Sequence, residues 1–303
     1  MNTDLNECRL CPRNCGVDRS RGQRGYCGMT QEIRLARAAL HMWEEPCISG
    51  KNGSGTVFFT GCPLRCVFCQ NREIALGDVG KAVSIERLVE IFFELKERGA
   101  HNINLVTPTH YVPQIAVALA RAKEAGLELP IVYNTGSYEN VETLKMLEGL
   151  IDIYLPDFKY ASSELAATYS HAADYPQVAD AAIREMLRQV GKPVFDGDML
   201  QRGVIVRHLV LPGHTKDSKT VIRHLLDTYH NDIYISIMNQ YTPLGGLIGY
   251  PELQRKVTAR EYEKVIDYAI DMGIENGFMQ EGDTARESFI PDFTCEGVSK
   301  ETI

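Results

Sequence analysis

Three cysteines lie within a short stretch of the sequence, at Cys62, Cys66 and Cys69, directly after the apolar run 56–60. Thiolates are soft ligands that select iron–sulfur clusters, zinc or cuprous copper. A tight loop that leaves a short strand can direct all three sulfurs at one point. Three ligands leave one corner of a metal centre open, whereas structural zinc normally takes four protein ligands. The spacing, with Phe68 before the third cysteine, therefore favours a catalytic cluster loop over a zinc loop or three ordinary thiols.

A second set of cysteines lies near the N-terminus, in a stretch with too few apolar residues to fold alone. Its members are Cys8, Cys11, Cys15 and Cys27. Four thiolates could close a tetrahedral site, and small segments gain folding free energy from such sites. Zinc fits a closed site best, but a second iron–sulfur cluster that relays electrons uses the same ligands. Four unligated thiols are the remaining alternative.

The 303-residue chain has the composition of an ordinary globular protein, with 44% hydrophobic and 24% charged residues. Its formal net charge of −8 argues against a general electrostatic grip on nucleic acid or anionic lipid. No run approaches the roughly 18 apolar residues of a spanning helix, and residues 1–30 lack the apolar core of a signal peptide. Nine cysteines, an odd number, fit metal ligation in a reducing compartment better than disulfides. We therefore expect a cytoplasmic protein with no membrane partner.

From residue 56 onward, short apolar runs rich in β-formers alternate with runs of helical periodicity. The expected strands are 57–60, 103–106, 131–133, 151–155, 204–210 and 233–238, and the expected helices are 84–98, 113–125, 141–147, 163–189 with a break near Pro176, 219–229 and 258–272. Ser84 fits an N-cap for the first helix, and Thr258 with Glu261 fits a capping box for the last. Six strand–helix units predict an α/β fold, a partial parallel (β/α)6 barrel with right-handed crossovers.

The expected domain organisation has two parts. Residues 1–50 form a small cysteine-rich, metal-binding extension, in which 33–39 is an extended link, and residues 51–303 form the barrel. One large core is feasible at this length, because α/β barrels reach this size as single domains.

Polar residues follow the expected strands at the points where the strands end. In barrels of this type the site lies at the carboxyl ends of the strands. The residues concerned are Thr107 and Thr109, Asn134 and Thr135, Asp157 and Lys159, His208, and Asn239 with Gln240 and Tyr241. Turn residues are often hydrophilic whatever the chemistry, so the whole set indicates a site more strongly than any single member does.

The CxxxCxxC pattern at 62–69, with an aromatic residue before its last cysteine, is the signature of the radical S-adenosylmethionine (radical SAM) enzymes, and the chain resembles that superfamily. More of the sequence is similar to the PflX group, relatives of the pyruvate formate-lyase activating enzyme. The stretches that carry this likeness are 41–47, 53–55, 69–71, 102–110, 154–160 and 207–213. The resemblance covers nearly the whole chain and implies a partial (β/α) barrel, in agreement with the strand and helix pattern.

The resemblance implies that the three cysteines of 62–69 hold a [4Fe-4S] cluster whose fourth iron chelates the amino and carboxylate groups of S-adenosylmethionine. One electron from the reduced cluster would cleave this cofactor to methionine and a 5′-deoxyadenosyl radical that abstracts hydrogen from a substrate. A reducing electron donor such as flavodoxin or ferredoxin is then required. Phe68 would lie against the adenine.

The resemblance also implies cofactor contacts at the strand ends. The loop 107–109 occupies the place of the family's Gly-Gly-Glu loop, which holds the amino group, but it lacks the glycines and the acid. Asn134 and Thr135 resemble the ribose and carboxylate loop, with Asn where an acid often stands. Asp157 and Lys159 match an Asp-x-Lys strand end beside the methionine portion.

Three functions are compatible with the sequence. The resemblance implies an activase that generates a glycyl radical on a partner enzyme, although such activases mostly carry extra cysteines after the cluster motif and this chain carries them before it. The alternative is radical modification of a small molecule, a peptide or a nucleic acid. The third function, from another class, is a non-catalytic metal-binding interaction module that uses the N-terminal cysteines. The sequence leaves the substrate open.

Overall fold

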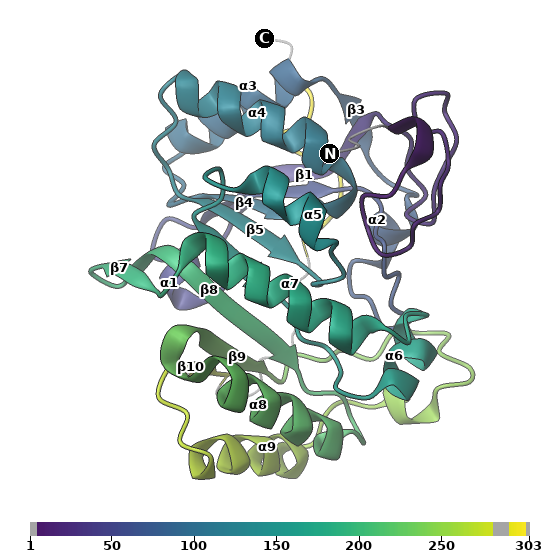
Figure 1. Cartoon of the computed structure of the whole chain (residues 1–303), viewed down its shortest axis with the longest axis vertical. Coiled ribbons are helices and arrows are strands. Elements are labelled where there is room, and N and C mark those ends of the chain that lie inside the picture. The colour runs from purple at the N-terminus through teal and green to yellow at the C-terminus, as the bar shows by residue number, and fades with distance from the viewer. Residues whose placement is uncertain (1–4, 281–290, 301–303) are drawn as a thin grey trace.

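The computed structural model describes residues 5–280 and 291–300. Its centre is a mostly parallel sheet with the strand order β10-β9-β8-β6-β5-β4-β2-β1-β3 (Figure 1). The strands are β1 (Ile33–His41), β2 (Ser54–Phe59), β3 (Lys81–Val83), β4 (Ile103–Val106), β5 (Ile131–Thr135), β6 (Ile153–Pro156), β7 (Val194–Asp196), β8 (Met199–Leu209), β9 (Tyr234–Met238) and β10 (Gly277–Met279). The short β7 pairs with β8 outside this order.

Neighbouring strands from β2 through β10 in that order run parallel. In their register Leu105 lies opposite Val57 on one side and Tyr133 on the other. Every residue of β2, β4, β5 and β6 is buried, as parallel strands covered on both faces require. The predicted α/β fold with a partial parallel barrel is confirmed.

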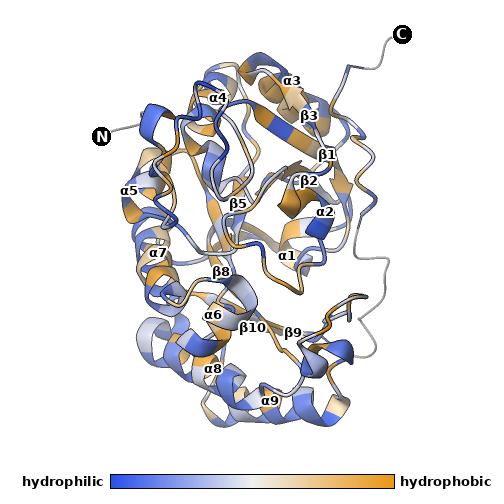
Figure 2. Ribbon diagram, turned by 90° about the vertical axis from the view of Figure 1, so that its right-hand side faces the viewer, coloured by the Kyte–Doolittle hydropathy of each residue, from blue (hydrophilic) through white to orange (hydrophobic). Residues whose placement is uncertain are grey.

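Helices connect these strands, and α4, α7, α8 and α9 follow one face of the sheet (Figures 1 and 2). The helices are α1 (Pro46–Ser49), α2 (Arg72–Leu76), α3 (Ile85–Glu97), α4 (Val112–Glu124), α5 (Val141–Leu144), α6 (Ser163–Ser170), α7 (Tyr175–Val190), α8 (Thr215–Tyr229) and α9 (Ala259–Asp271). Both predicted caps are present: Ser84 Oγ accepts from the N–H of Arg87 (3.1 Å), and Thr258 with Glu261 forms the capping box. No helix in the described part of the chain is long and apolar enough to cross a membrane.

Two apolar layers lie on the two faces of the sheet. The outer layer joins the buried face of α3, which includes Leu88 and Phe92, to Leu105, Tyr133 and Tyr154. The inner layer closes one end of the barrel with Cys47 and Ile48 of α1 and with Val132, Ile153, Leu155, Leu200 and Ile205 of the strands. This packing makes Cys47 a buried thiol in an apolar environment.

Strand alternation carries this inner face from apolar to polar toward the carboxyl ends of the strands. Side chains two residues apart on a strand share one face. Val132 of β5, Leu155 of β6 and Ile205 of β8 lie in the inner layer. Two positions further on, the same three segments present polar side chains that line a cavity, and these are Asn134, Asp157 and Arg207.

Residues 33–41 form β1, a full strand of the sheet, where the sequence predicted an extended link. It pairs antiparallel with β2, and its register places Ala38 opposite Val57 and His41 opposite Ser54. The edge of β2 that faces away from β4 thereby gains a hydrogen-bonding partner. The division of the chain at residue 50 stays a prediction.

Candidate active site

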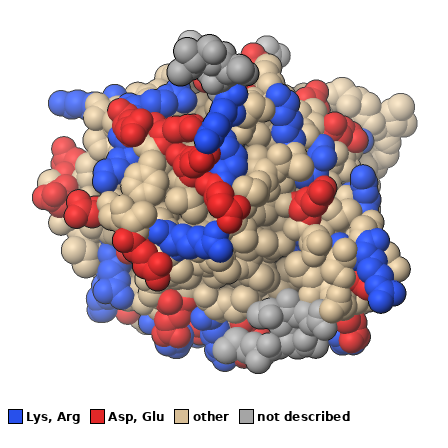
Figure 3. Space-filling view, turned by 90° about the horizontal axis from the view of Figure 1, so that it is seen from above, with Lys and Arg blue, Asp and Glu red and all other residues tan. Residues whose placement is uncertain are grey.

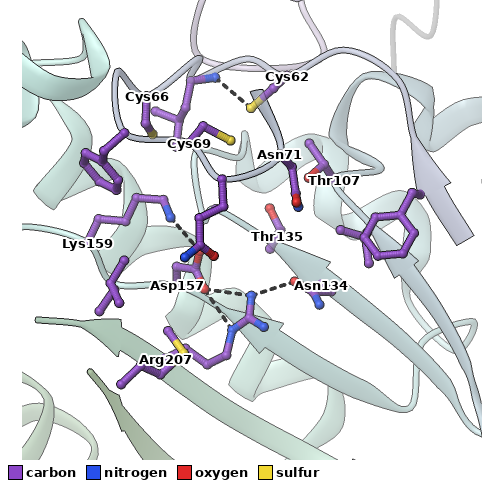
Figure 4. A pocket seen from close by; sticks show the side chains of 18 of the residues that line it. Cys62, Cys66, Cys69, Asn71, Thr107, Asn134, Thr135, Asp157, Lys159 and Arg207 are labelled. Carbon is purple, nitrogen blue, oxygen red and sulfur yellow. Dashed lines mark hydrogen bonds and ion pairs between the residues drawn. The ribbon is translucent and has the colours of Figure 1, made fainter. Parts of the chain in front are cut away.

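The three closely spaced cysteines lie in residues 60–71, here called the cluster loop, which follows β2 and passes over the cavity (Figure 4). Gly61 opens the loop with a φ of 92°, and a Cβ at this position would lie 2.5 Å from the Cγ of Met29. Only glycine therefore fits here. Further along, the N–H of Val67 donates to the carbonyl of Tyr169 (2.8 Å), which ties the loop to the end of α6.

The three sulfurs lie close together at the top of the cavity (Figure 4). Cys66 Sγ accepts a hydrogen bond from Ser170 Oγ at 3.0 Å. Burial raises the pKa of Cys62 to about 11 and that of Cys69 to about 12. Without a bound cation these thiols therefore keep their protons at neutral pH, and a soft cationic centre is what would hold them as thiolates.

The three cysteines fit an iron–sulfur cluster by their chemistry, although their sulfurs are not yet arranged as cluster ligands. As the side chains stand, no group of three or more His, Cys, Asp or Glu among residues 5–280 and 291–300 is placed so as to hold a metal ion. The cluster loop nevertheless supplies three soft ligands over one cavity, with the spacing that leaves one coordination position open.

Below the sulfurs lie the polar side chains of Asn134, Asp157, Lys159 and Arg207 (Figure 4). Together with Glu44, which lines the same cavity, they are here called the strand-end charge cluster. Arg207 stands at its centre. Its Nε and Nη2 lie 2.9 and 2.8 Å from Asp157 Oδ1, Nη1 lies 3.3 Å from Glu44 Oε2, and Nη2 donates to Asn134 Oδ1 at 2.7 Å. Lys159 Nζ lies 2.6 Å from Asp157 Oδ2. Two cations thus face two carboxylates in a largely buried place.

These contacts determine which side chains of the strand-end charge cluster are ionised. Burial by itself would raise the pKa of Asp157, but Arg207 and Lys159 hold it below its usual value. Burial would lower the pKa of Lys159, but Asp157 holds it above its usual value. For Glu44 burial outweighs the attraction of Arg207, and its pKa is raised. At neutral pH the cavity therefore contains two fixed cations and an ionised Asp157.

Behind the cavity wall, the Glu139 side chain accepts hydrogen bonds from the hydroxyl groups of two threonines that line the cavity. Thr109 Oγ1 donates to Glu139 Oε1 (2.6 Å), Thr135 Oγ1 donates to the same oxygen, and so does the hydroxyl of Tyr133 (3.3 Å). Burial raises the pKa of Glu139 to about 7. An acid therefore stands near the loop 107–109 after all, but it lies behind the threonines and does not line the cavity.

The cavity itself has a volume of about 240 Å³. Its apolar wall includes Phe58, Val106, Leu209 and Met238, and Trp43, with 56% of its surface exposed, also lines it. Phe68 lines the cavity from the cluster loop. Its ring packs edge-on against the rings of three tyrosines at centroid distances of 6.2 to 6.3 Å, and these are Tyr160, Tyr169 and Tyr241.

The four N-terminal cysteines lie outside this cavity. Cys8, Cys11 and Cys27 are buried, and Cys15 is exposed. Burial raises the pKa of Cys27, and charges on Cys8 and Cys15 add to the rise. Burial raises the pKa of Cys11 to about 12, and Cys27 and Cys8 add to that rise. Cys15 Sγ lies 4.0 Å from the carbonyl oxygen of Cys8, and the sulfurs of Cys15 and Cys27 both lie near Gly25. These thiols therefore lie in one region of the N-terminal segment.

A sequence profile described as the radical SAM superfamily matches residues 56–225, more than half of the chain. The chain belongs to the radical SAM superfamily. The matched region contains most of β2, the whole cluster loop and every member of the strand-end charge cluster except Glu44. Membership confirms the predicted superfamily and implies the [4Fe-4S] cluster and S-adenosylmethionine as cofactors; the PflX grouping stays a prediction.

Relatives and solved structures agree with this assignment. An uncharacterised protein of Methanocaldococcus jannaschii is 28% identical over 271 residues, which are 86% of this chain and 74% of that protein. SuiB of Streptococcus suis, solved with its precursor peptide SuiA, superimposes with a TM-score of 0.51 at 16% identity over 74% of this chain and 47% of SuiB, so this radical SAM chain matches about half of SuiB's length. A radical SAM methyltransferase from Sphaerobacter thermophilus gives a TM-score of 0.51 at 15% identity over 78% of this chain and 69% of that chain. At these identities the likeness is one of fold.

The radical SAM cavity brings together all the residues that the sequence predicted for the cluster and the cofactor. These are Cys62, Cys66, Cys69, Phe68, Thr107, Thr109, Asn134, Thr135, Asp157 and Lys159. Their individual contacts with the cofactor stay predictions. Thr109 and Thr135 line the cavity, but their hydroxyl groups donate to Glu139 instead of pointing to a bound cofactor.

Sequence reasoning missed Glu44, Arg207 and Glu139. Strand alternation could have found Arg207, because it lies two positions after the inner-layer residue Ile205. It would also have excluded His208, which is buried outside the cavity with its Nδ1 2.7 Å from the carbonyl of Phe158. For Glu44 and Glu139, which lie in loops beyond the strands, no local pattern gives the direction of the side chain.

Proposed function

We propose that this radical SAM enzyme cleaves S-adenosylmethionine reductively at a cluster held by Cys62, Cys66 and Cys69 and abstracts hydrogen from a polypeptide substrate. When bound, the cluster supplies the electron that converts the cofactor to methionine and a 5′-deoxyadenosyl radical. The observation that carries the proposal is that one cavity holds three thiols from the cluster loop above the Asp157–Lys159 ion pair.

The chain's own residues bind and orient the cofactor in this proposal. Lys159 and Arg207 place positive charge where a carboxylate would lie, and Asp157 and Asn134 offer oxygen acceptors for an ammonium group. Because each of these groups is already fixed by its neighbours, little order is lost when the cofactor binds. Phe68, held among three tyrosines, offers a flat apolar surface to the adenine.

The size of the cavity supports a polypeptide substrate. Small-molecule sites typically measure roughly 300–1,000 Å³, and this cavity has a volume of about 240 Å³, so a bound cofactor would leave little room for a second small molecule. In this proposal the reacting group enters from outside the cavity, past the lining residue Trp43, which is 56% exposed. A loop of a partner protein meets this requirement, as in an activase that forms a glycyl radical.

The charge distribution supports the same choice over nucleic acid. The net charge is −8, and Figure 3 shows basic and acidic side chains interspersed on the face it presents. Nucleic-acid sites are marked by basic side chains gathered on one face. An exposed apolar side chain at the cavity, such as Trp43, fits contact with a polypeptide better than contact with a nucleic acid.

The test is anaerobic reconstitution of the full chain with iron and sulfide, followed by reduction with flavodoxin or ferredoxin. We expect the electron paramagnetic resonance signal of a reduced cluster and formation of 5′-deoxyadenosine. Partner glycyl radical enzymes carrying α-deuterated glycine should transfer deuterium into 5′-deoxyadenosine. Deuterium transfer from free metabolites instead would favour small-molecule modification, and failure to cleave the cofactor would favour a non-catalytic metal-binding module.

A further inference from the structure

Arg19 is a fully buried arginine without an acidic partner. Its exposed fraction is 0%, and it forms no ion pair with any Asp or Glu among the residues that the structure describes. Nε and Nη2 donate to the carbonyl of Thr30 (3.1 and 2.6 Å), and Nη1 donates to the carbonyl of His110 (2.6 Å). Its other contacts are Cys8 Sγ, 3.8 Å from Nη1, and the ring of Tyr111, whose centroid lies 5.6 Å from Cζ. Buried charges are normally paired, so an anion is expected at the Cys8 sulfur.

The surroundings of Cys8 supply a source for that anion. The four N-terminal thiols lie in one region, and the backbone folds around them: the N–H of Gly16 donates to the carbonyl of Cys8 and the N–H of Asn14 to that of Cys11, both at 3.0 Å. A Cβ at Gly25 would lie 2.8 Å from Cys15 Sγ and 3.9 Å from Cys27 Sγ, so both sulfurs lie close to this glycine. Four thiolates around a divalent cation carry a formal charge of −2, half of which a buried guanidinium offsets.

We propose that the N-terminal cysteines hold one Zn²⁺ as a closed tetrathiolate site, that Arg19 is its buried counter-charge, and that the site braces the cluster loop through Arg13. The ligands are Cys8, Cys11, Cys15 and Cys27. Among the described residues no three of these thiols are placed to hold an ion as the side chains stand, so the proposal requires the cysteine side chains to rotate toward one point when the ion binds. Zinc is the metal proposed because structural zinc sites are closed by four protein ligands; a second iron–sulfur cluster would use the same four cysteines and is an outcome of the test below.

Arg13 connects this site to the cluster loop. It lies in the turn between Cys11 and Cys15. Its Nε donates to the carbonyl of Pro63 at 2.7 Å, its Nη2 to the carbonyl of Ser170 at 2.8 Å, and its Nη1 to the carbonyl of His171. Pro63 follows the first cysteine of the cluster loop, and the Ser170 hydroxyl donates to the sulfur of the second. The Arg13 guanidinium therefore binds the backbone next to Cys62 and the backbone of Ser170, whose hydroxyl contacts Cys66.

Two aromatic rings fix the position of that guanidinium. The Cζ of Arg13 lies 4.0 Å from the ring centroid of Tyr26 and 5.0 Å from that of Tyr138. In the sequence Arg13 lies between Cys11 and Cys15, and Tyr26, which contacts it in space, directly precedes Cys27. Loss of the ion would free the turn 11–15 to move, and Arg13 would then no longer be held against Pro63 and Ser170.

The experiment compares the wild type with a Cys8→Ser/Cys11→Ser variant, using Cys295→Ser as the matched control. Each full-length chain is purified anaerobically, its zinc and iron contents are measured, and hydrogen–deuterium exchange is followed in peptides covering 62–69. We expect one zinc per chain in the wild type and control, none in the double variant, and at least about tenfold faster exchange of the cluster loop when zinc is absent.

A second pair of variants separates the brace from the metal. Arg13→Gln should keep its zinc but show the faster exchange of 62–69, whereas Arg21→Gln, whose side chain is 86% exposed, should match the wild type. If the double variant does not fold, Arg13→Gln and wild type stripped of zinc by a chelator still decide the question. These readouts use no cofactor cleavage, so they stand or fall separately from the proposed function.

Three results would overturn the proposal. Loss of about four irons with no change in zinc would identify a second cluster. Unchanged zinc and iron in the double variant would show that these cysteines bind neither metal. Wild-type exchange rates in Arg13→Gln, or in zinc-stripped protein, would show that the site does not brace the cluster loop.

Discussion

Arg207 and Asp157 lie side by side at the ends of neighbouring strands, and two nitrogens of the guanidinium approach one carboxylate oxygen, Nε at 2.9 Å and Nη2 at 2.8 Å from Oδ1. The pair is extended by Lys159 on one side and by Glu44 on the other. Because β6 and β8 are neighbours only in the folded sheet, this relationship joins residues 50 positions apart in the sequence.

Replacing any one of Cys62, Cys66 and Cys69 with Ala should abolish the reduced-cluster signal and the reductive formation of 5′-deoxyadenosine. In the proposed site each thiolate would hold one iron, and the cluster loop contains no fourth cysteine. The measurement is electron paramagnetic resonance with chromatographic product analysis, and Cys47→Ala, in the inner apolar layer, is the control. An unchanged yield of 5′-deoxyadenosine would refute the cluster assignment.

Asp157→Asn should weaken the binding of S-adenosylmethionine at least about tenfold, or about 1.4 kcal/mol. The amide keeps an acceptor for Arg207, but Lys159 loses the charge that orients its ammonium group. Calorimetry measures the affinity, and circular dichroism checks that the fold is retained. Asp227→Asn on the exposed side of α8 is the control. Equal affinities in the variant and wild type would remove Asp157 from the cofactor site.

Arg207→Met should destabilise the fold at pH 7 by up to about 3–5 kcal/mol, because it leaves Asp157 with Lys159 as its one remaining cation and takes the cation away from the buried Glu44. Urea unfolding measures the loss. The defect should shrink at pH 5 as the carboxylates take up protons, and adding Glu44→Gln should restore part of the stability. A loss that is independent of pH would show that the packing of Arg207, rather than its charge, is what matters.

Glu139 gives a stability effect of opposite sign to that of Asp157. Its pKa is raised to about 7, above the ordinary 4.5, so the folded state binds the proton more tightly than the unfolded state. The protonated Glu139 side chain therefore adds about 3 kcal/mol to the free energy of unfolding below about pH 4.5, and this stabilisation is lost as pH rises through about 7.

Glu139→Gln should therefore become more stable than the wild type as pH rises from 5 to 8, since Gln accepts the same hydroxyl hydrogen bonds without ionising. Denaturant unfolding of both proteins across this range measures the difference. The exposed Glu142→Gln serves as the control. A difference that stays constant with pH would mean that Glu139 titrates alike in both states.

Much of the fold and part of the site follow from local patterns. The cluster loop is identified by the spacing of its cysteines, α3 and α9 by their periodicity and caps, and the order of strands and helices by apolar runs separated by turn residues. Each of these signals lies within a few residues of the feature that it predicts, because helix geometry, capping and strand alternation are local.

The tertiary structure decided which side chains meet. Glu44 reaches Arg207 only because β1 pairs with β2 and α1 closes the inner layer, and Arg13 reaches Pro63 only because the cysteine-rich segment packs beside the cluster loop. Such pairings depend on sheet order and on loop conformations, which the packing of the whole chain fixes and no single stretch of sequence encodes. The sequence alone determined that this chain carries a radical SAM cluster motif on an alternating α/β frame; the burial of a charged network beneath that motif was decided by the folded sheet.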